Sequence, residues 1–179
     1  MLQFSANLSM LFTEVPLVER FALAKQHGFD AVEIQFPYEL TIDELNQQLA
    51  LNKQQLVLIN VPAGDLMQGG DGLASVPGRE YEFRQAVFQA IRYASALHVP
   101  TVNILAGRQS IHADLLPCLQ TLSKNLRFAS TEMSSAPIIV PTTVPAPPKR
   151  DAPPITTAAT VSSTSASPAL AAPLVKRVL

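Results

Sequence analysis

Short apolar runs alternate with segments of helical periodicity over the first 132 of the 179 residues. This alternation is typical of βα units whose strands form a parallel sheet. It predicts four strands, at residues 3–7, 31–36, 56–60 and 101–105. It predicts helices at residues 16–27, from Thr41 onward, around residues 83–94 and at residues 112–130. The expected fold class is therefore α/β, with four βα units.

Local signals place the ends of two of these helices. Gly28 is the expected stop of the first helix, because glycine readily adopts the left-handed conformation that ends helices. Thr41 and Glu44 have the spacing of a capping box, which predicts the start of the second helix. The helix at residues 112–130 is expected to bury four leucines at helical spacing: Leu115, Leu119, Leu122 and Leu126.

The composition changes at Met133. From there to the end the chain has no glycine, five charged residues and nine of the fifteen prolines. Proline breaks helix interiors and removes hydrogen-bond donors from a sheet, so residues 133–179 are predicted to be a disordered tail rich in Pro, Ala, Ser and Thr. The apolar run at residues 138–140 lies between Pro137 and Pro141, which disfavours a fifth strand.

Chain length limits the size of the sheet. A complete (β/α)8 barrel usually takes about 250 residues, and this chain has 179. There is room for one domain, expected at residues 1–132, and not for a whole barrel, so four βα units would make only a partial (β/α)8 TIM barrel. Its edge strands, residues 3–7 and 101–105, would be left open, which predicts self-association through those edges or aggregation.

Charge and cysteine content exclude several classes of partner. The formal net charge is -1 and no basic cluster exceeds two neighbours, so neither nucleic acid nor an anionic membrane is an expected partner. A single cysteine, Cys118, excludes an internal disulfide. No signal peptide and no apolar run of about 18 residues is visible. These features favour a cytoplasmic protein with a small-molecule partner.

Candidate site residues follow from the rule that function in parallel barrels lies at the carboxyl ends of strands. The rule selects four polar residues as pocket candidates: Asn7, Glu33, Asn60 and Asn103. It also selects residues of the loops that follow the strands: Pro62, Gly64, Asp65 and Gly107. Glu33 lies in an apolar strand, where a carboxylate is costly without a partner. A role at the barrel mouth and a structural pairing remain equally open for it.

Other polar residues have simpler explanations. The histidines and the cysteine lie in predicted helices or at their ends, where packing or surface roles are common: His27, His98, His112 and Cys118. The run Gly69–Gly72 lacks the Lys-Ser/Thr pair of a phosphate loop and is expected to form a flexible lid. Arg79 and Arg84 could bind a carboxylate, although solvated charges are common at helix starts.

Several separated segments together resemble the hydroxypyruvate isomerase family. They occur in the family's order along about the first 132 residues: Asn7-Leu8-Ser9-Met10-Leu11-Phe12, Gly28-Phe29-Asp30-Ala31-Val32-Glu33, Phe36-Pro37-Tyr38, Asn60-Val61-Pro62-Ala63-Gly64-Asp65, Pro77-Gly78-Arg79-Glu80, Ile91-Arg92-Tyr93-Ala94 and Lys124-Asn125-Leu126-Arg127-Phe128-Ala129. The resemblance implies a xylose-isomerase-like barrel. It also implies interconversion of hydroxypyruvate and tartronate semialdehyde (2-hydroxy-3-oxopropanoate), with a sister branch that acts on 2-oxo-tetronates.

The resemblance also implies a catalytic apparatus that this sequence lacks. The family uses two glutamates, one of them in a Glu-Pro-Ile-Asn motif that closes strand five, and related barrels often hold a divalent metal. Residues 134–141, where that motif is expected, contain no carboxylate. We therefore assign no catalytic residue, no metal ligand and no demonstrable cofactor, and we expect a truncated and inactive chain. A reading-frame change near residue 133 is our hypothesis for the tail.

Two alternatives belong to other functional classes. A half-barrel could act as a non-enzymatic interaction module, with the proline-rich tail as a ligand for proline-reading domains. An abasic-site endonuclease of the same barrel superfamily would need a cluster of His and acidic metal ligands and a basic face. The sequence shows neither of these features.

Overall fold

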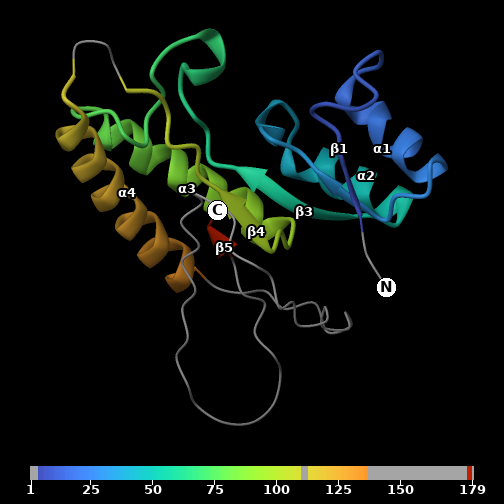
Figure 1. Ribbon diagram of the computed structural model, residues 1–179. Coiled ribbons are helices and arrows are strands. Elements are labelled where there is room, and N and C mark those ends of the chain that lie inside the picture. Colours follow the sequence, from blue (N-terminus) through green and yellow to red (C-terminus); the bar gives the residue numbers. More distant parts are fainter. Residues whose placement is uncertain (1–3, 110–112, 137–176, 179) are drawn as a thin grey trace.

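The computed structural model describes residues 4–109, 113–136 and 177–178 of the chain. Within them, parallel strands form one sheet in the order β1-β2-β3-β4-β5, so each strand pairs with the next one along the chain (Figure 1). The strands are β1 (Ser5–Asn7), β2 (Ala31–Glu33), β3 (Gln55–Asn60), β4 (Thr101–Asn103) and β5 (Arg177–Val178). The helices are α1 (Leu17–Gln26), α2 (Ile42–Asn52), α3 (Glu80–Ala96) and α4 (Leu115–Ser135). The predicted α/β class with four βα units is confirmed.

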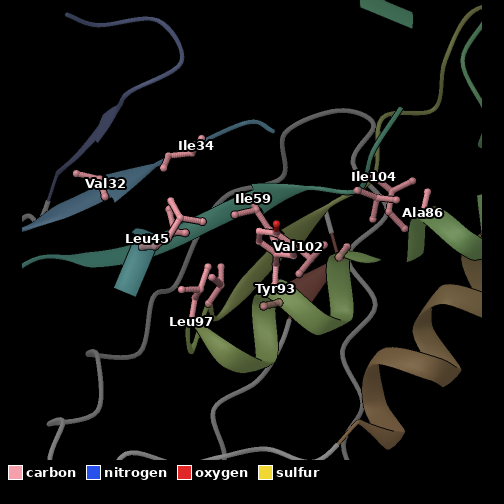
Figure 2. Close-up of a cluster of buried hydrophobic side chains, with 14 of the residues drawn as sticks. Val32, Ile34, Leu45, Ile59, Ala86, Tyr93, Leu97, Val102 and Ile104 are labelled. Atoms are coloured by element: carbon pink, nitrogen blue, oxygen red, sulfur yellow. The ribbon is translucent and has the colours of Figure 1, made fainter. Parts of the chain in front are cut away.

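Alternate residues of the strands form the core with the helices. Val32, Ile59 and Val102 are buried almost completely and lie on the helix side of the sheet, where they meet Leu45 of α2 and Tyr93 of α3 (Figure 2). Because successive side chains of a strand point to opposite faces, their immediate neighbours lie on the other face. Burial of each such side chain contributes roughly 1.5–3 kcal/mol. This core holds the sheet against its helix layer.

A β-bulge in β3 maintains this alternation across the sheet. Val32 pairs with Leu56, but the next residue of β2, Glu33, pairs with Leu58, so Val57 is an extra residue in β3. An extra residue shifts the alternation by one position. The shift places Ile59 on the helix side and Asn60 on the opposite face, level with Val102 and Asn103 of β4. The bulge thereby orients the polar end of β3.

The predicted helix signals at α1 and α2 are confirmed. Thr41 Oγ1 accepts from the amide of Glu44 over 3.2 Å, and the Thr41 amide donates to Glu44 Oε2 over 2.7 Å, which completes the capping box. The bond from the Thr41 amide lowers the pKa of the Glu44 carboxyl, and the Thr41 hydroxyl, which donates to the same oxygen over 2.7 Å, lowers it further. Gly28, at φ +85, follows the end of α1 and donates its amide to Lys25.

Helix α4 differs from its prediction in its bounds and in its buried face. It begins at Leu115 instead of residue 112 and continues to Ser135. Its buried residues are Cys118, Thr121, Asn125, Ala129 and Met133. Of the predicted leucines, Leu122 and Leu126 are partly buried against the core. Leu115 and Leu119 are 54% and 50% exposed, so their predicted burial is wrong.

The face of α4 is rotated because its small and polar side chains allow a close approach. Asn125 Nδ2 donates to the carbonyl of Ala74 over 2.9 Å, and both groups lie in the interior. Phe128 packs edge-on against Phe88 of α3, with ring centroids 5.8 Å apart. A buried hydrogen bond and an aromatic pair therefore orient this helix more strongly than its leucines do.

The prediction that the strand at residues 101–105 has an open edge is wrong for its first two residues. Thr101 pairs with Arg177, and Val102 pairs with Val178. In the described part of the chain, β1 has a neighbour on one side only, as predicted. Residues 137–176, which include most of the predicted tail and the apolar run at 138–140, lie outside the described residues, as does His112. The domain boundary at residue 132 and the reading-frame hypothesis stay predictions.

Searched over its described residues, the chain shows no helix that is both long and apolar enough to cross a lipid bilayer.

Candidate active site

Four polar residues predicted from the sequence lie on one face of the sheet, opposite the helix layer. Asn7 pairs with Glu33 across β1 and β2, and Asn60 pairs with Asn103 across β3 and β4. All four are the last residues of their strands. Since the carboxyl ends of parallel strands lie at the same edge, the structure brings the four residues together there. We call Asn7, Glu33, Asn60 and Asn103 the polar row.

Asn60 and Asn103 form a direct amide pair. Asn103 Nδ2 donates to Asn60 Oδ1 over 3.0 Å, and Asn60 is only 3% exposed. The Tyr38 hydroxyl donates to the backbone carbonyl of Asn60 over 2.5 Å. Burial raises the pKa of Tyr38, with a smaller contribution from Tyr93, so this phenol stays a proton donor at neutral pH. These bonds fix the end of β3.

Glu33 has a hydroxyl partner. Ser5 Oγ donates to Glu33 Oε1 over 2.5 Å, and both side chains are half-buried. None of the ion pairs among the described residues includes Glu33. The carboxylate is therefore paired to a neutral hydroxyl donor. Ser5 was missed as a site residue, although its position two residues before Asn7 places it on the same face.

Asn7 organises the loop that follows β1. Its Oδ1 accepts from the amide of Ser9 over 3.0 Å, which is the geometry of an Asx turn. Ser9 Oγ in turn accepts from the amide of Gln35 over 2.8 Å. Through these bonds Asn7 connects the loop after β1 to the segment after β2.

The loop between β3 and α3 has its own hydrogen-bond network. Asp65 Oδ1 accepts from the amide of Gly72 over 3.0 Å and from Arg79 Nη1 over 2.9 Å. The Gly72 amide is the main reason that the pKa of Asp65 is lowered. Arg79 also binds both carboxylate oxygens of Glu82, at 3.0 Å and 2.7 Å. Arg79, a candidate for binding a substrate carboxylate, thus donates to groups of the protein itself.

The loops after β3 and β4 meet at Gly107. The Arg108 amide donates to the carbonyl of Asp71 over 2.9 Å, and Arg108 Nη1 donates to the carbonyl of Gly69 over 3.1 Å. Gly107 has φ +92, and a Cβ there would lie 2.4 Å from the Asp71 carbonyl oxygen. Only glycine permits this approach. The run Gly69–Gly72, predicted to be a flexible lid, is therefore bonded to its neighbouring loop.

The remaining candidates lie away from the polar row. His27 caps the end of α1 and stacks on Phe12, with centroids 5.4 Å apart. Cys118 is buried in α4, and Arg84 lies over the ring of Phe128 at 5.1 Å. Within the described ranges, no group of three or more His, Cys, Asp or Glu side chains could hold a metal ion.

A parallel sheet with sequential strand order, one helical layer and polar residues at the carboxyl ends of its strands defines part of a (β/α) barrel. A family model described as xylose isomerase-like TIM barrel matches residues 21–140. The chain belongs to this family.

Individual relatives carry isomerase names. The chain is 46% identical over 147 residues to a hydroxypyruvate isomerase of Escherichia coli (strain K12), a match that covers 78% of this chain and 54% of the relative. It is 39% identical over 128 residues to a 2-oxo-tetronate isomerase of Haemophilus influenzae, covering 72% of this chain and 50% of that protein. The chain spans about half the length of the curated relatives it matches.

A solved structure is similar over the same region. The crystal structure titled AP endonuclease, family 2 from Brucella melitensis has a TM-score of 0.71 and 40% sequence identity, and the match covers 75% of this chain and 52% of that one. The predicted family resemblance is confirmed by these matches.

Proposed function

We propose that this chain forms one wall of the substrate pocket of an isomerase that interconverts hydroxypyruvate and 2-hydroxy-3-oxopropanoate. The observation that carries the proposal is the 46% identity to the hydroxypyruvate isomerase of Escherichia coli. The polar row supports it, because Asn7, Glu33, Asn60 and Asn103 are the last residues of four neighbouring strands. Small hydroxy-oxo acids offer hydroxyl and carbonyl groups that amides and carboxylates bind.

The reaction moves one proton between adjacent carbons. A base removes a proton from the hydroxymethyl carbon of hydroxypyruvate while the carbonyl oxygen takes up a proton, which gives an enediol. A proton then returns to the former carbonyl carbon, and the other enediol hydroxyl loses its proton as it becomes the aldehyde oxygen. The negative charge that develops on the oxygens needs hydrogen-bond donors. In our proposal the amides of Asn60 and Asn103 supply such donors, and Tyr38 holds the backbone of Asn60 in place.

The proton-transfer groups are proposed to come from outside residues 4–109 and 113–136. The family resemblance places the two catalytic glutamates in later strands. We assign no metal ligand to the described residues, because no group of three or more His, Cys, Asp or Glu side chains among them could hold a metal ion. The cytoplasm is the proposed compartment, and self-association through the free side of β1 is the proposed assembly.

A second substrate has specific support from the relatives. The protein of Haemophilus influenzae is named 2-oxo-tetronate isomerase, and 2-oxo-tetronate isomerisation needs the same proton transfer at a longer substrate. Comparing the two substrates in one assay decides between these branches. An abasic-site DNA duplex belongs in the same assay, because the structure from Brucella melitensis has an endonuclease title.

The test uses two purified proteins: this chain, and residues 1–132 joined to the second half of the Escherichia coli relative. Both are assayed with hydroxypyruvate and a divalent metal. We expect turnover by the joined protein only. Turnover by the chain alone would show that Glu33 or another described residue acts as the base. A folded joined protein that is inactive on both oxo acids, or that cleaves the DNA, would overturn the proposal.

A further inference from the structure

The polar row carries a single negative charge, that of Glu33. Glu33 is its only ionisable member, and strands β1 to β4 contain no Lys, Arg or His. The arginines near this edge of the sheet donate to groups of the protein. Arg20 binds the carbonyls of Val15 and Leu8, each over 2.8 Å. Arg79 binds Asp65 and Glu82. Among the described residues no ion pair includes Glu33, so its carboxylate has no salt-bridge partner there.

Ser5 leaves one oxygen of Glu33 available. The Ser5 hydroxyl donates to Oε1, whereas Oε2 has no hydrogen-bond partner among the described residues. A bond to one carboxylate oxygen fixes the rotation of the group and hence the direction of the other oxygen. A carboxylate oxygen is an acceptor only, so it binds a ligand hydroxyl and repels a ligand carboxylate.

The amide pair provides the complementary groups. Asn103 uses one N–H for Asn60, which leaves its Oδ1 and its second N–H for a ligand. Glu33 is level with Leu58, two residues before Asn60 on the neighbouring strand, so the Cα atoms of Glu33 and Asn60 lie roughly 8 Å apart by strand geometry. This separation is comparable with the length of a ligand of a few carbon atoms.

On this basis, and resting on the proposed isomerase function, we propose that Glu33 is the residue that binds the terminal hydroxyl of the substrate, with Ser5 as its positioning residue. The inner face of β1 to β4 then selects the uncharged hydroxy-carbonyl end of the substrate. The carboxylate of the substrate points away from this half of the barrel, toward groups outside the described residues.

Three small ligands distinguish the contributions of the two ends of the substrate to binding. Hydroxypyruvate has both ends, dihydroxyacetone has the hydroxyl but no carboxylate, and pyruvate has the carboxylate but no terminal hydroxyl. Each is titrated into the isotope-labelled chain, and the side-chain amide signals of Asn60 and Asn103 are followed by NMR. We expect hydroxypyruvate and dihydroxyacetone to shift these signals, and pyruvate to bind at least about tenfold more weakly, because it lacks the bond to a charged acceptor.

Substitutions test the role of the charge. Glu33→Gln keeps the shape and an acceptor oxygen but removes the repulsion, so pyruvate should bind this variant within about threefold of dihydroxyacetone. Ser5→Ala should weaken dihydroxyacetone binding while keeping its preference over pyruvate. Glu19→Gln, on the exposed side of α1, is the matched control and should behave as the unsubstituted chain does.

The unsubstituted chain alone is sufficient to overturn the inference. Equal shifts by pyruvate and dihydroxyacetone, or no shift with any ligand, would contradict it whether or not the variants fold. The assay of the joined protein reports separately on the proposed function. If that protein isomerises hydroxypyruvate while the NMR preference is absent, the isomerase function stands and the role of Glu33 is wrong. If the joined protein is inactive while the NMR preference is present, the hydroxyl-binding role of Glu33 stands and the isomerase function is wrong.

Discussion

Helices α3 and α4 have similar apolar periodicity but very different environments. In α3 the apolar residues Phe83, Val87 and Ala90 are buried against the sheet. In α4 the leucine stripe is only partly covered, and Leu119, Leu122 and Leu126 line a shallow hollow of about 590 Å³. The two helices pack against each other. Only α3 has its apolar stripe fully buried.

The difference shows what amphipathic periodicity predicts and what it does not. Apolar residues at helical spacing predict a helix with one favoured face. They do not predict which surface covers that face. In α4 a second stripe, which contains Cys118, Asn125 and Ala129, faces inward, and the leucines are exposed or only partly buried. The burial of a helix depends on its neighbours, which its own sequence does not describe.

The largest expected effect compares one apolar residue from each helix. Phe83→Ala removes a side chain that is 1% exposed and should lower the free energy of unfolding by about 3–5 kcal/mol. Leu119→Ala removes a side chain that is 50% exposed and should lower it by less than about 1 kcal/mol. Urea unfolding followed by circular dichroism measures both values.

Equal losses for the two substitutions would show that the leucine stripe is covered in solution. Size-exclusion chromatography with light scattering would then identify the cause. If Leu119→Ala also converts a dimer to a monomer, a second copy covers α4 and the contrast between the helices belongs to the isolated chain only.

A smaller effect concerns the polar contact that orients α4. Asn125→Ala leaves the buried carbonyl of Ala74 without its donor, so the free energy of unfolding should fall by about 1–3 kcal/mol. Lys124→Ala, at the neighbouring exposed position, is the matched control and should change it by no more than about 0.5 kcal/mol. If Asn125→Ala behaves like its control, the leucines determine the orientation of α4 and our explanation of the rotated face is wrong.

The fold was predictable to the extent that local signals determine it. The order of the four βα units and the capping box at Thr41 follow from short-range patterns, and the structure has both. The orientation of α4 and the pairing of Thr101 with Arg177 depend on contacts between distant parts of the chain. A single sequence does not specify such contacts.

The polar row was predictable from the sequence, but its bonds and the Ser5 partner of Glu33 were not. The strand-end rule selected Asn7, Glu33, Asn60 and Asn103, and the structure places them on one face. The extra residue in β3 that turns Asn60 to this face has no signature in the sequence. The Ser5–Glu33 and Asn60–Asn103 bonds join residues 28 and 43 positions apart, so no local pattern indicates them.

The smallest effect compares the starts of the two helices. Neither N-cap side chain, Arg79 of α3 or Asp114 of α4, makes a capping hydrogen bond, but Arg79 also binds Asp65 and Glu82. The bonds lower the pKa of both carboxyls, chiefly through the Gly72 amide for Asp65 and through Arg79 for Glu82. A lowered folded-state pKa stabilises the fold above the unfolded pKa, and that stabilisation is lost as the pH falls through the folded value.

The loss at α3 should therefore occur below pH 3.8, the ordinary value for an aspartate. An NMR titration from pH 6 to pH 2 measures it through the amide of Gly72, which donates to Asp65. We expect the Gly72 signal to move with a midpoint below 3.8, and the movement to disappear in Asp65→Asn, which cannot titrate. Both carboxyls are exposed, so the effect on global stability should be small. A Gly72 midpoint at or above 3.8 would mean that the bonds of Asp65 to the Gly72 amide and to Arg79 do not persist in solution. The start of α3 would then be no better anchored than that of α4.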